Sequence, residues 1–366
     1  MHNQSSLLQS PSSTTFEVLK HVQVYYEPGR YGGWPANHGI WRWGDEVLVG
    51  FQSGAYKEQA GHTIDWQQPI RKVFARSRDG GETWALEDTL PDALDNPVEN
   101  AGVLLTPHAQ AQPCPGGIDF THPDFVMTFS HASFHVGPSR FWTSTDRGHT
   151  WAGPYRLPDM VTRGIGARTD YLVNRRADCT LFLTAAKQNG REGRPFCART
   201  TDGGRTWRLV AWIGPEPQEG FVIMPASVRL PNGHMLVALR AQPDRTRSSI
   251  QAYRSGDDGL TWQQLPDPIP ALAPSNPPAF IRLHDDRLCL AYGVRAAPYR
   301  MCARLSSDDG MTWGDELVLR DDGANGDMGY PRCVQRDDGV IVTVYYFNDA
   351  ATGVERYIGA TLWRAF

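Results

Sequence analysis

Residues 77–84 read Ser-Arg-Asp-Gly-Gly-Glu-Thr-Trp, and the pattern Ser/Thr-x-Asp-x-Gly-x-Thr-Trp that they define occurs five times in the chain. The other copies span residues 144–151, 200–207, 255–262 and 306–313. Each copy is typical of a tight turn, in which the Asp accepts hydrogen bonds from nearby backbone N–H groups and the Gly adopts a positive φ. The Thr and Trp then re-enter a strand, where we expect the Trp to pack between neighbouring sheets.

The spacing of these turns predicts the fold. The copies begin 51 to 67 residues apart, close to the length that a four-stranded antiparallel sheet and its connections need, which is the signature of a β-propeller. A second repeat, an apolar strand that usually follows a polar turn, counts the blades. Such strands are expected at residues 47–51, 125–129, 181–185, 235–239, 288–292 and 341–345. Six strands against five turns predict six blades, the last without the turn motif.

We expect the two ends of the chain to close the ring. Residues 16–26 alternate like a strand, which would pair with the C-terminal segment 356–363 and so remove an exposed sheet edge. The prediction is an all-β protein with one six-bladed β-propeller of four-stranded antiparallel blades over residues 16–366, preceded by a flexible tail at 1–15. Residues 92–101 and the Pro-rich stretch 106–123 indicate an irregular entry into the second blade.

Composition and charge exclude several partners. The net charge is −4, from 36 Lys and Arg against 40 Asp and Glu, with no basic face suited to a nucleic acid. No apolar run reaches membrane-spanning length, so we expect a soluble protein with no membrane partner. The N-terminus lacks the features of a secretory signal, which favours a cytoplasmic protein, or a secreted one whose leader has been removed. The oligomeric state is not predicted.

No cofactor and no metal site are expected. The six cysteines form no C-x-x-C motif and favour reduced, buried thiols. His131 and His135 have no predictable ligand geometry at a strand end. The acidic run at 321–327 lacks the terminal bidentate Glu of a calcium loop, and we interpret it as a turn.

The expected register also selects the residues around the central axis, because the innermost strand of each blade lines the channel. On the innermost strands it places Asn37, His38, Arg168, Asp170, Tyr171, Met224, Pro225, Asn276, Asp327, Tyr330 and Arg332. Near the ends of the second strands it places Gln52, His131, Lys187, Arg240 and Arg295. The cations Arg168, Lys187, Arg240 and Arg295 suit a small carboxylate ligand. Alternatively the arginines pair with acids, of which Asp170 and Asp327 are available.

Five such turns on six blades, with arginines at these positions, resemble the sialidase (neuraminidase) superfamily of BNR-repeat, or Asp-box, propellers over residues 16–366. In that family three arginines clamp the sugar carboxylate, a Tyr assisted by a Glu is the nucleophile, and an Asp is the acid/base. The resemblance implies that Arg240 and Arg295 are the second and third arginines and that Tyr330 is the nucleophile. It implies that Asp65 is the acid/base, with His62 competing for that role.

The chain departs from the family pattern at two places. Where the first arginine is expected, it reads Asn37-His38-Gly39. The strand at 222–227 lacks the expected Glu, and the nearest acid is Glu219 on the preceding loop. His38 is therefore a candidate to replace the missing arginine as a donor to the anion, or to act as a base.

Three functions are compatible with these residues. The first is a sialidase-like, exo-acting glycoside hydrolase for a terminal acidic sugar, with Tyr330, Asp65 and His38 as catalytic residues. Its substrate-binding residues would be Arg240, Arg295, Arg168, Lys187, His131, Arg332, Asp327 and His62. The second is a polysaccharide lyase for uronate glycans, with His38, His131 or His62 as base, Tyr330 as acid and Arg168 or Arg295 neutralising the carboxylate. The third is a non-catalytic carbohydrate-binding propeller.

Overall fold

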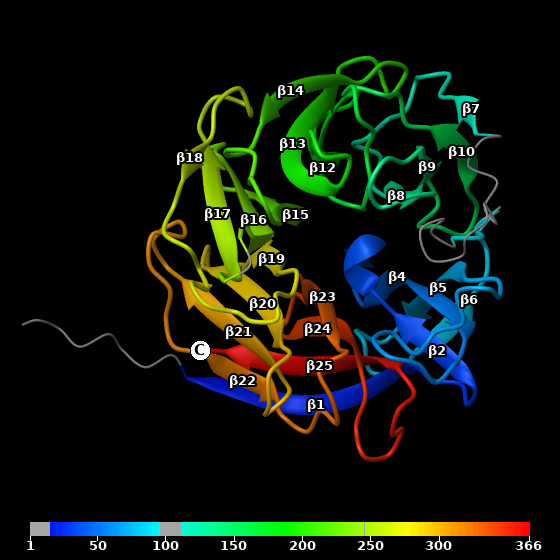
Figure 1. Cartoon of the computed structure of the whole chain (residues 1–366), viewed down its shortest axis with the longest axis vertical. Coiled ribbons are helices and arrows are strands. Elements are labelled where there is room, and N and C mark those ends of the chain that lie inside the picture. The colour runs from blue at the N-terminus through cyan, green and yellow to red at the C-terminus, as the bar shows by residue number, and fades with distance from the viewer. Residues whose placement is uncertain (1–14, 92, 96–110, 245) are drawn as a thin grey trace, which may run out of the picture.

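The computed structural model describes residues 15–91, 93–95, 111–244 and 246–366, and these form six β-sheets arranged in a ring (Figure 1). The predicted six-bladed β-propeller is therefore confirmed. The expected flexible tail at 1–15 lies, except for residue 15, outside the described residues. Among the described residues, no helix is long and apolar enough to span a membrane.

The strands follow one another from the axis to the rim in most blades. Blade one contains β2 (Arg30–Gly33), β3 (Ile40–Trp43), β4 (Glu46–Ala55), β5 (Arg71–Ser77) and β6 (Ala85–Glu87). Blade two contains β7 (Gln112–Pro113), β8 (Val126–His131), β9 (Ser139–Ser144) and β10 (Ala152–Arg156). Blade three contains β11 (Tyr171–Arg175), β12 (Asp178–Ala186), β13 (Glu192–Thr200) and β14 (Arg208–Trp212).

The second half of the ring is built in the same way. Blade four contains β15 (Phe221–Arg229), β16 (Met235–Gln242), β17 (Ser249–Ser255) and β18 (Gln263–Gln264). Blade five contains β19 (Ala279–Arg282), β20 (Leu288–Val294), β21 (Arg300–Ser306) and β22 (Leu317–Arg320). Blade six contains β23 (Gly329–Gln335), β24 (Ile341–Phe347) and β25 (Tyr357–Ala365), completed by β1 (Phe16–Tyr25).

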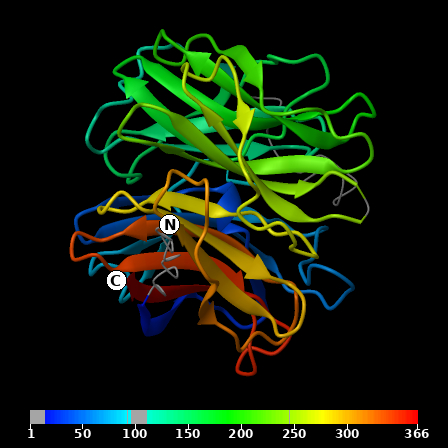
Figure 2. The same cartoon turned by 90° about the vertical axis from the view of Figure 1, so that its left-hand side faces the viewer.

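The ring is closed by the two ends of the chain, as predicted. β1 pairs antiparallel with β25, from Phe16 opposite Ala365 to Tyr25 opposite Ile358. The blue and red strands lie side by side in Figure 1, and Figure 2 shows the same pair from the side. The pairing covers the backbone edge of β25, which would otherwise be open to pairing with another chain.

Two blades depart from the regular pattern. In blade one the inner strand is split into β2 and β3, which pair with opposite ends of β4. The one-turn 3-10 helix η1 (Pro35–Asn37) lies between them. Asn37 therefore ends this helix and His38 follows it in a turn, so neither is on a strand as expected. In blade two β7 pairs with β10 in parallel, and part of the irregular entry predicted there, residues 96–110, lies outside the described residues.

The five repeated turns share one hydrogen-bond pattern. In each, the first Ser or Thr donates from its Oγ to the Asp Oδ1 at 2.6 to 2.8 Å. The later Thr donates its backbone N–H to Oδ1 at 2.8 to 2.9 Å and its Oγ1 hydroxyl to Oδ2 at 2.5 to 2.6 Å. The Gly of each turn has φ between 83° and 96°, which a side chain would strain.

The tryptophan of each turn packs between two blades, as predicted. Trp84 lies against the core shared by blades one and six, and Trp151 against that of blades one and two. Trp207, Trp262 and Trp313 occupy the next three interfaces in order. In the interface of blades five and six, which has no such turn, the fully buried Trp363 of β25 is part of the core. The turns therefore orient the side chains that join successive blades.

We expect Asp308→Ala to lower the free energy of unfolding by about 1 to 3 kcal/mol, because it removes the acceptor of three hydrogen bonds in the turn between β21 and β22. Urea unfolding followed by tryptophan fluorescence measures this change. Ser307→Ala, at an exposed position of the same turn, is the matched control and is expected to be near neutral. Equal stability of the two variants would contradict a structural role for the Asp.

Candidate active site

A cavity of about 550 Å³ lies at the centre of the ring, within the size range of small-molecule sites. Residues from all six blades and their connections line it. They include Trp34, Asn37, His38, Gln52, His62, Trp66, Asp95, Phe129, Ser130, His131, Phe134, His135, Arg168, Glu192, Phe221, Ile223, Arg240, Arg295 and Tyr330. Seven of the eleven predicted site residues are in this set, namely Tyr330, His38, Arg240, Arg295, Arg168, His131 and His62.

Tyr330 is held on the axis by an unusual backbone conformation at the start of β23. Its φ is 51°, in the left-handed region that non-glycine residues rarely adopt, and the preceding Gly329 has φ 107°. The side chain of Asn276 fastens this segment: its Oδ1 accepts the Tyr330 N–H at 3.1 Å and its Nδ2 donates to the Met328 carbonyl at 3.0 Å. The two hydrogen bonds of Asn276 hold this strained segment in place and so fix the position of the Tyr330 ring.

Arg240 and Arg295 lie beside the Tyr330 ring. Arg240 donates from Nη1 to the Tyr330 hydroxyl at 2.9 Å and from Nε to Ser275 at 2.9 Å. Arg295 donates from Nη2 to the Tyr346 hydroxyl at 2.7 Å, and its guanidinium carbon lies 5.3 Å from the centre of the Tyr330 ring. No carboxylate of the described residues lies within 4.0 Å of either guanidinium. Their positive charge is therefore available to an anionic ligand.

The surrounding arginines change the acidity of Tyr330. Burial by itself raises the pKa of the phenol, but the charges of Arg240, Arg295 and Arg168 and the hydrogen bond from Arg240 outweigh it, so the pKa lies below its ordinary value of 10.0. A phenol with a lowered pKa gives up its proton more readily. Tyr330 is thus suited to act as a nucleophile or as a proton donor.

Arg168 is paired with an acid that the sequence did not predict. It donates from Nη1 and Nη2 to both oxygens of Glu192, the Nη2–Oε2 distance being 3.1 Å, and from Nε to Asn37 Oδ1 at 3.1 Å. Glu192 begins β13, opposite Ala186 at the end of β12. Asp170, one of the two acids that the sequence offered as partners for the arginines, accepts a hydrogen bond from the Ser227 hydroxyl and lies 3.7 Å from Arg332.

Four of the predicted residues do not line the cavity, namely Lys187, Arg332, Asp65 and Asp327. Lys187 is 2% exposed and donates to the Pro217 carbonyl at 3.2 Å. Arg332 lies deeper along the axis, where it donates to the carbonyls of Ala36 and Thr169. Asp65 follows a loop of blade one, and its carboxylate accepts the Gln67 N–H at 3.1 Å and lies 3.4 Å from Lys57. The neighbouring Trp66 lines the cavity in its place.

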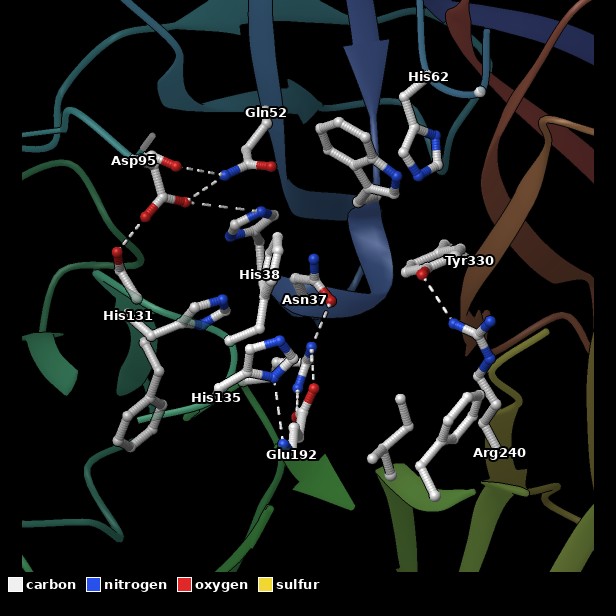
Figure 3. A pocket seen from close by; sticks show the side chains of 18 of the residues that line it. Asn37, His38, Gln52, His62, Asp95, His131, His135, Glu192, Arg240 and Tyr330 are labelled. Atoms are coloured by element: carbon white, nitrogen blue, oxygen red, sulfur yellow. Dashed lines mark hydrogen bonds and ion pairs between the residues drawn. The ribbon is translucent and has the colours of Figure 1, made fainter. Parts of the chain in front are cut away.

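His62 contacts the predicted residue Asp327, which lies behind the cavity wall. The distance from His62 Nδ1 to Asp327 Oδ1 is 2.7 Å. Asp327 also accepts hydrogen bonds from the Tyr346 hydroxyl at 2.7 Å and from Arg356 Nε at 3.1 Å. Burial raises the pKa of Asp327, but His62, Arg356 and Tyr346 outweigh it and the net shift is downward. An ionised Asp327 therefore orients the His62 ring, which Figure 3 shows above Tyr330.

The other end of the cavity contains His38 and an acid, Asp95, that the sequence did not single out. Asp95 follows β6 in the segment expected only to be irregular, and Figure 3 shows it beside Gln52 and His38, across the cavity from Tyr330. Burial and the charge of Lys72 lower the pKa of His38 well below 6.5, so this histidine is neutral. Among the described residues, no three His, Cys, Asp or Glu side chains are grouped to hold a metal ion.

Comparison of the chain with known protein families identifies the family to which it belongs. The family described as "BNR repeat-like domain" matches residues 125–344, which is more than half of the chain. The protein therefore belongs to the BNR repeat-like domain family, as the five repeated turns indicated. A search of curated proteins gives no significant match.

Several solved structures share the fold at low sequence identity. A protein of unknown function from Dyadobacter fermentans is 18% identical with a TM-score of 0.72, over 96% of this chain and 99% of that one. An α-L-arabinofuranosidase from Fusarium graminearum, in complex with an iminosugar inhibitor, is 13% identical with a TM-score of 0.61, over 94% and 97%. A Trypanosoma rangeli sialidase in complex with the inhibitor DANA is 10% identical with a TM-score of 0.58, over 91% of this chain and 55% of that one.

Replacing Arg240 by Gln is expected to raise the pKa of Tyr330, because it removes a positive charge and weakens the hydrogen bond that stabilise the phenolate. The measurement is the ultraviolet titration of phenolate, taken as the difference between each protein and the same protein carrying Tyr330→Phe. Arg336→Gln, in the turn between β23 and β24 where Arg336 pairs with Asp338, is the control and should leave the Tyr330 titration unchanged. An identical Tyr330 titration in the Arg240 variant would contradict the assignment.

Proposed function

We propose that the protein is an exo-acting glycoside hydrolase for a terminal sugar that carries a carboxylate. The observation that supports this most directly is the pair Arg240 and Arg295, which flank Tyr330 in the cavity and have no carboxylate partner among the described residues. Two planar guanidinium groups match the oxygens of a carboxylate. The similarity of the fold to a sialidase and an arabinofuranosidase is consistent with glycosidic-bond chemistry.

In the proposed reaction, Arg240 and Arg295 bind the carboxylate and bring the anomeric carbon to the Tyr330 oxygen. The phenolate attacks this carbon, the glycosidic bond breaks, and protonated His62 gives its Nε2 proton to the leaving oxygen. Neutral His62 then takes a proton from water, whose oxygen displaces Tyr330 and releases the sugar. Asp327 holds His62 in both steps. His62, which lines the cavity, takes the acid/base role that the sequence assigned first to Asp65.

A lyase that acts on uronate glycans is the second candidate. It is favoured by the neutral His38, whose ring nitrogens have no hydrogen-bond partner among the described residues. An imidazole with a free nitrogen can remove the proton next to a carboxylate whose charge Arg295 neutralises, while Tyr330 protonates the leaving oxygen. Incubation with uronate glycans distinguishes the two reactions, because a lyase forms an unsaturated uronate that absorbs in the ultraviolet and a hydrolase forms none.

We expect Tyr330→Phe to lower kcat by about 10³-fold or more on whichever acidic glycoside is cleaved, because the nucleophile is removed. The assay compares aryl glycosides of acidic sugars with matched neutral sugars. Tyr26→Phe, at a position where the hydroxyl only contacts Glu355 outside the cavity, is the matched control. Undiminished turnover by Tyr330→Phe, or equal turnover of acidic and neutral glycosides, would overturn the proposal. Ligand binding without any turnover would favour a binding propeller.

A further inference from the structure

The cavity has a second polar end, formed by His38, Gln52, Asp95 and His131, which we call the His38 subsite. Figure 3 shows these side chains converging from blades one and two, on the far side of the cavity from Tyr330 and Arg240. The hydrolytic steps proposed above use none of them. Their hydrogen-bonding capacity therefore requires a separate explanation.

His38 has unused hydrogen-bonding groups in a position where they are costly. Its residue is 2% exposed, and neither Nδ1 nor Nε2 has a hydrogen-bond partner in the described structure. A buried polar group without a partner destabilises a protein, so such groups are rare unless a ligand or water completes them. The backbone of blade one packs closely against His38, because a β-carbon added at Gly50 would lie only 2.8 Å from His38 Cβ.

Asp95 is fixed next to His38 as a hydrogen-bond acceptor. Gln52 Nε2 donates to its Oδ2 at 2.6 Å and to its carbonyl at 3.1 Å, and the Ser130 hydroxyl donates to its Oδ1. The distance from His38 Nε2 to Asp95 Oδ2 is 4.0 Å. This is too long for a direct hydrogen bond, but one hydroxyl oxygen could lie within about 3 Å of both atoms and bridge them.

The remaining partner, His131, adds a further acceptor. Its Nδ1 lies 3.0 Å from the Ala167 carbonyl, which can only accept, so the proton is on Nδ1 and Nε2 keeps a lone pair. Two cations whose charges act on His38 are already engaged: Lys72 is 1% exposed and donates to Thr128 Oγ1 and the Phe129 carbonyl, and Arg168 is paired with Glu192. Among the described residues, this end of the cavity therefore presents acceptors and no unpaired cation, which suits neutral donors and disfavours an anion.

We infer that the His38 subsite binds free hydroxyl groups of the substrate, at the end of the sugar opposite its carboxylate. The inference rests on the proposed function for the position of the carboxylate at Arg240 and Arg295. It narrows the substrate class to acidic sugars with unsubstituted hydroxyls at that end. A sugar that is deoxygenated or O-methylated there would leave His38 and Asp95 without a partner and would be rejected.

Binding of free acidic sugars tests the subsite without an assay of turnover. The probes are N-acetylneuraminic acid and glucuronic acid, each with its set of single-deoxy analogues, measured by isothermal titration calorimetry. On the native protein at least one deoxy analogue should bind more weakly than its parent, by about threefold to tenfold for one lost hydrogen bond. In His38→Phe this difference should disappear, because the parent loses affinity and the analogue does not.

Asp95→Asn keeps the shape of the side chain and should also weaken binding of the parent sugar more than binding of the analogue. This second variant tests the subsite if His38→Phe fails to fold. His284→Phe, at an exposed turn between β19 and β20, is the matched control and should keep the native discrimination. The inference is overturned if neither parent sugar binds, if all analogues bind the native protein as well as their parents, or if the variants discriminate as the native protein does.

The same titrations separate this inference from the proposed hydrolase. Discrimination between hydroxyl analogues that depends on His38, in a protein that cleaves no glycoside, supports the subsite and contradicts the hydrolase. Cleavage of acidic glycosides with no hydroxyl discrimination contradicts the subsite and supports the hydrolase.

Discussion

The pairing of β1 with β25 is the constraint on which the rest of the structure depends. It joins the first residues of the propeller to the last strand of blade six, and a shared apolar core of blades one and six covers the junction. The two ends of the chain meet there, and the proposed acid/base residue meets the carboxylate that orients it at the same interface. His62 from blade one reaches Asp327, just before β23, across this interface. If the ring opened at this point, the acid/base residue would lose the group that orients it, so fold closure and the geometry of the site are one requirement.

Arginines that look alike in the sequence have different environments in the cavity. Arg168 is neutralised by Glu192, and Arg332 lies near Asp170 and donates to backbone carbonyls on the axis. Arg240 and Arg295 instead donate to hydroxyls, to a backbone carbonyl and to the Met224 sulfur, and no carboxylate of the described residues pairs with them. Burying an unpaired charge is unfavourable. Here the buried charges of Arg240 and Arg295 lower the pKa of Tyr330. At the opposite end of the cavity, around His38 and Asp95, the described residues provide acceptors and no unpaired cation, so the cavity is polarised along its length.

Most of the fold was predictable from the sequence, but less of the site. The blades were predictable because each repeated turn is completed within eight residues, by an Asp that bonds its own neighbours. The strand register then located Tyr330, Arg240, Arg295, His38 and His131 at the cavity. It missed Glu192 because that residue begins the third strand of its blade. A third strand runs antiparallel to the second and therefore starts beside the cavity end of the second strand. It missed Asp95 because that segment has no periodic pattern.

By itself, the sequence determined the number of blades, their order and the closure of the ring. It could do so because turn chemistry and the alternation of apolar residues each depend on a short segment of the chain. Only the tertiary structure decided which charges are paired and which remain free. Tyr330 and Arg240 are 90 residues apart, and His62 and Asp327 are 265 apart. Contacts of this kind depend on side chains from different blades converging on one axis. The geometry of these contacts depends on the closed ring, because the two partners of each contact come from different blades.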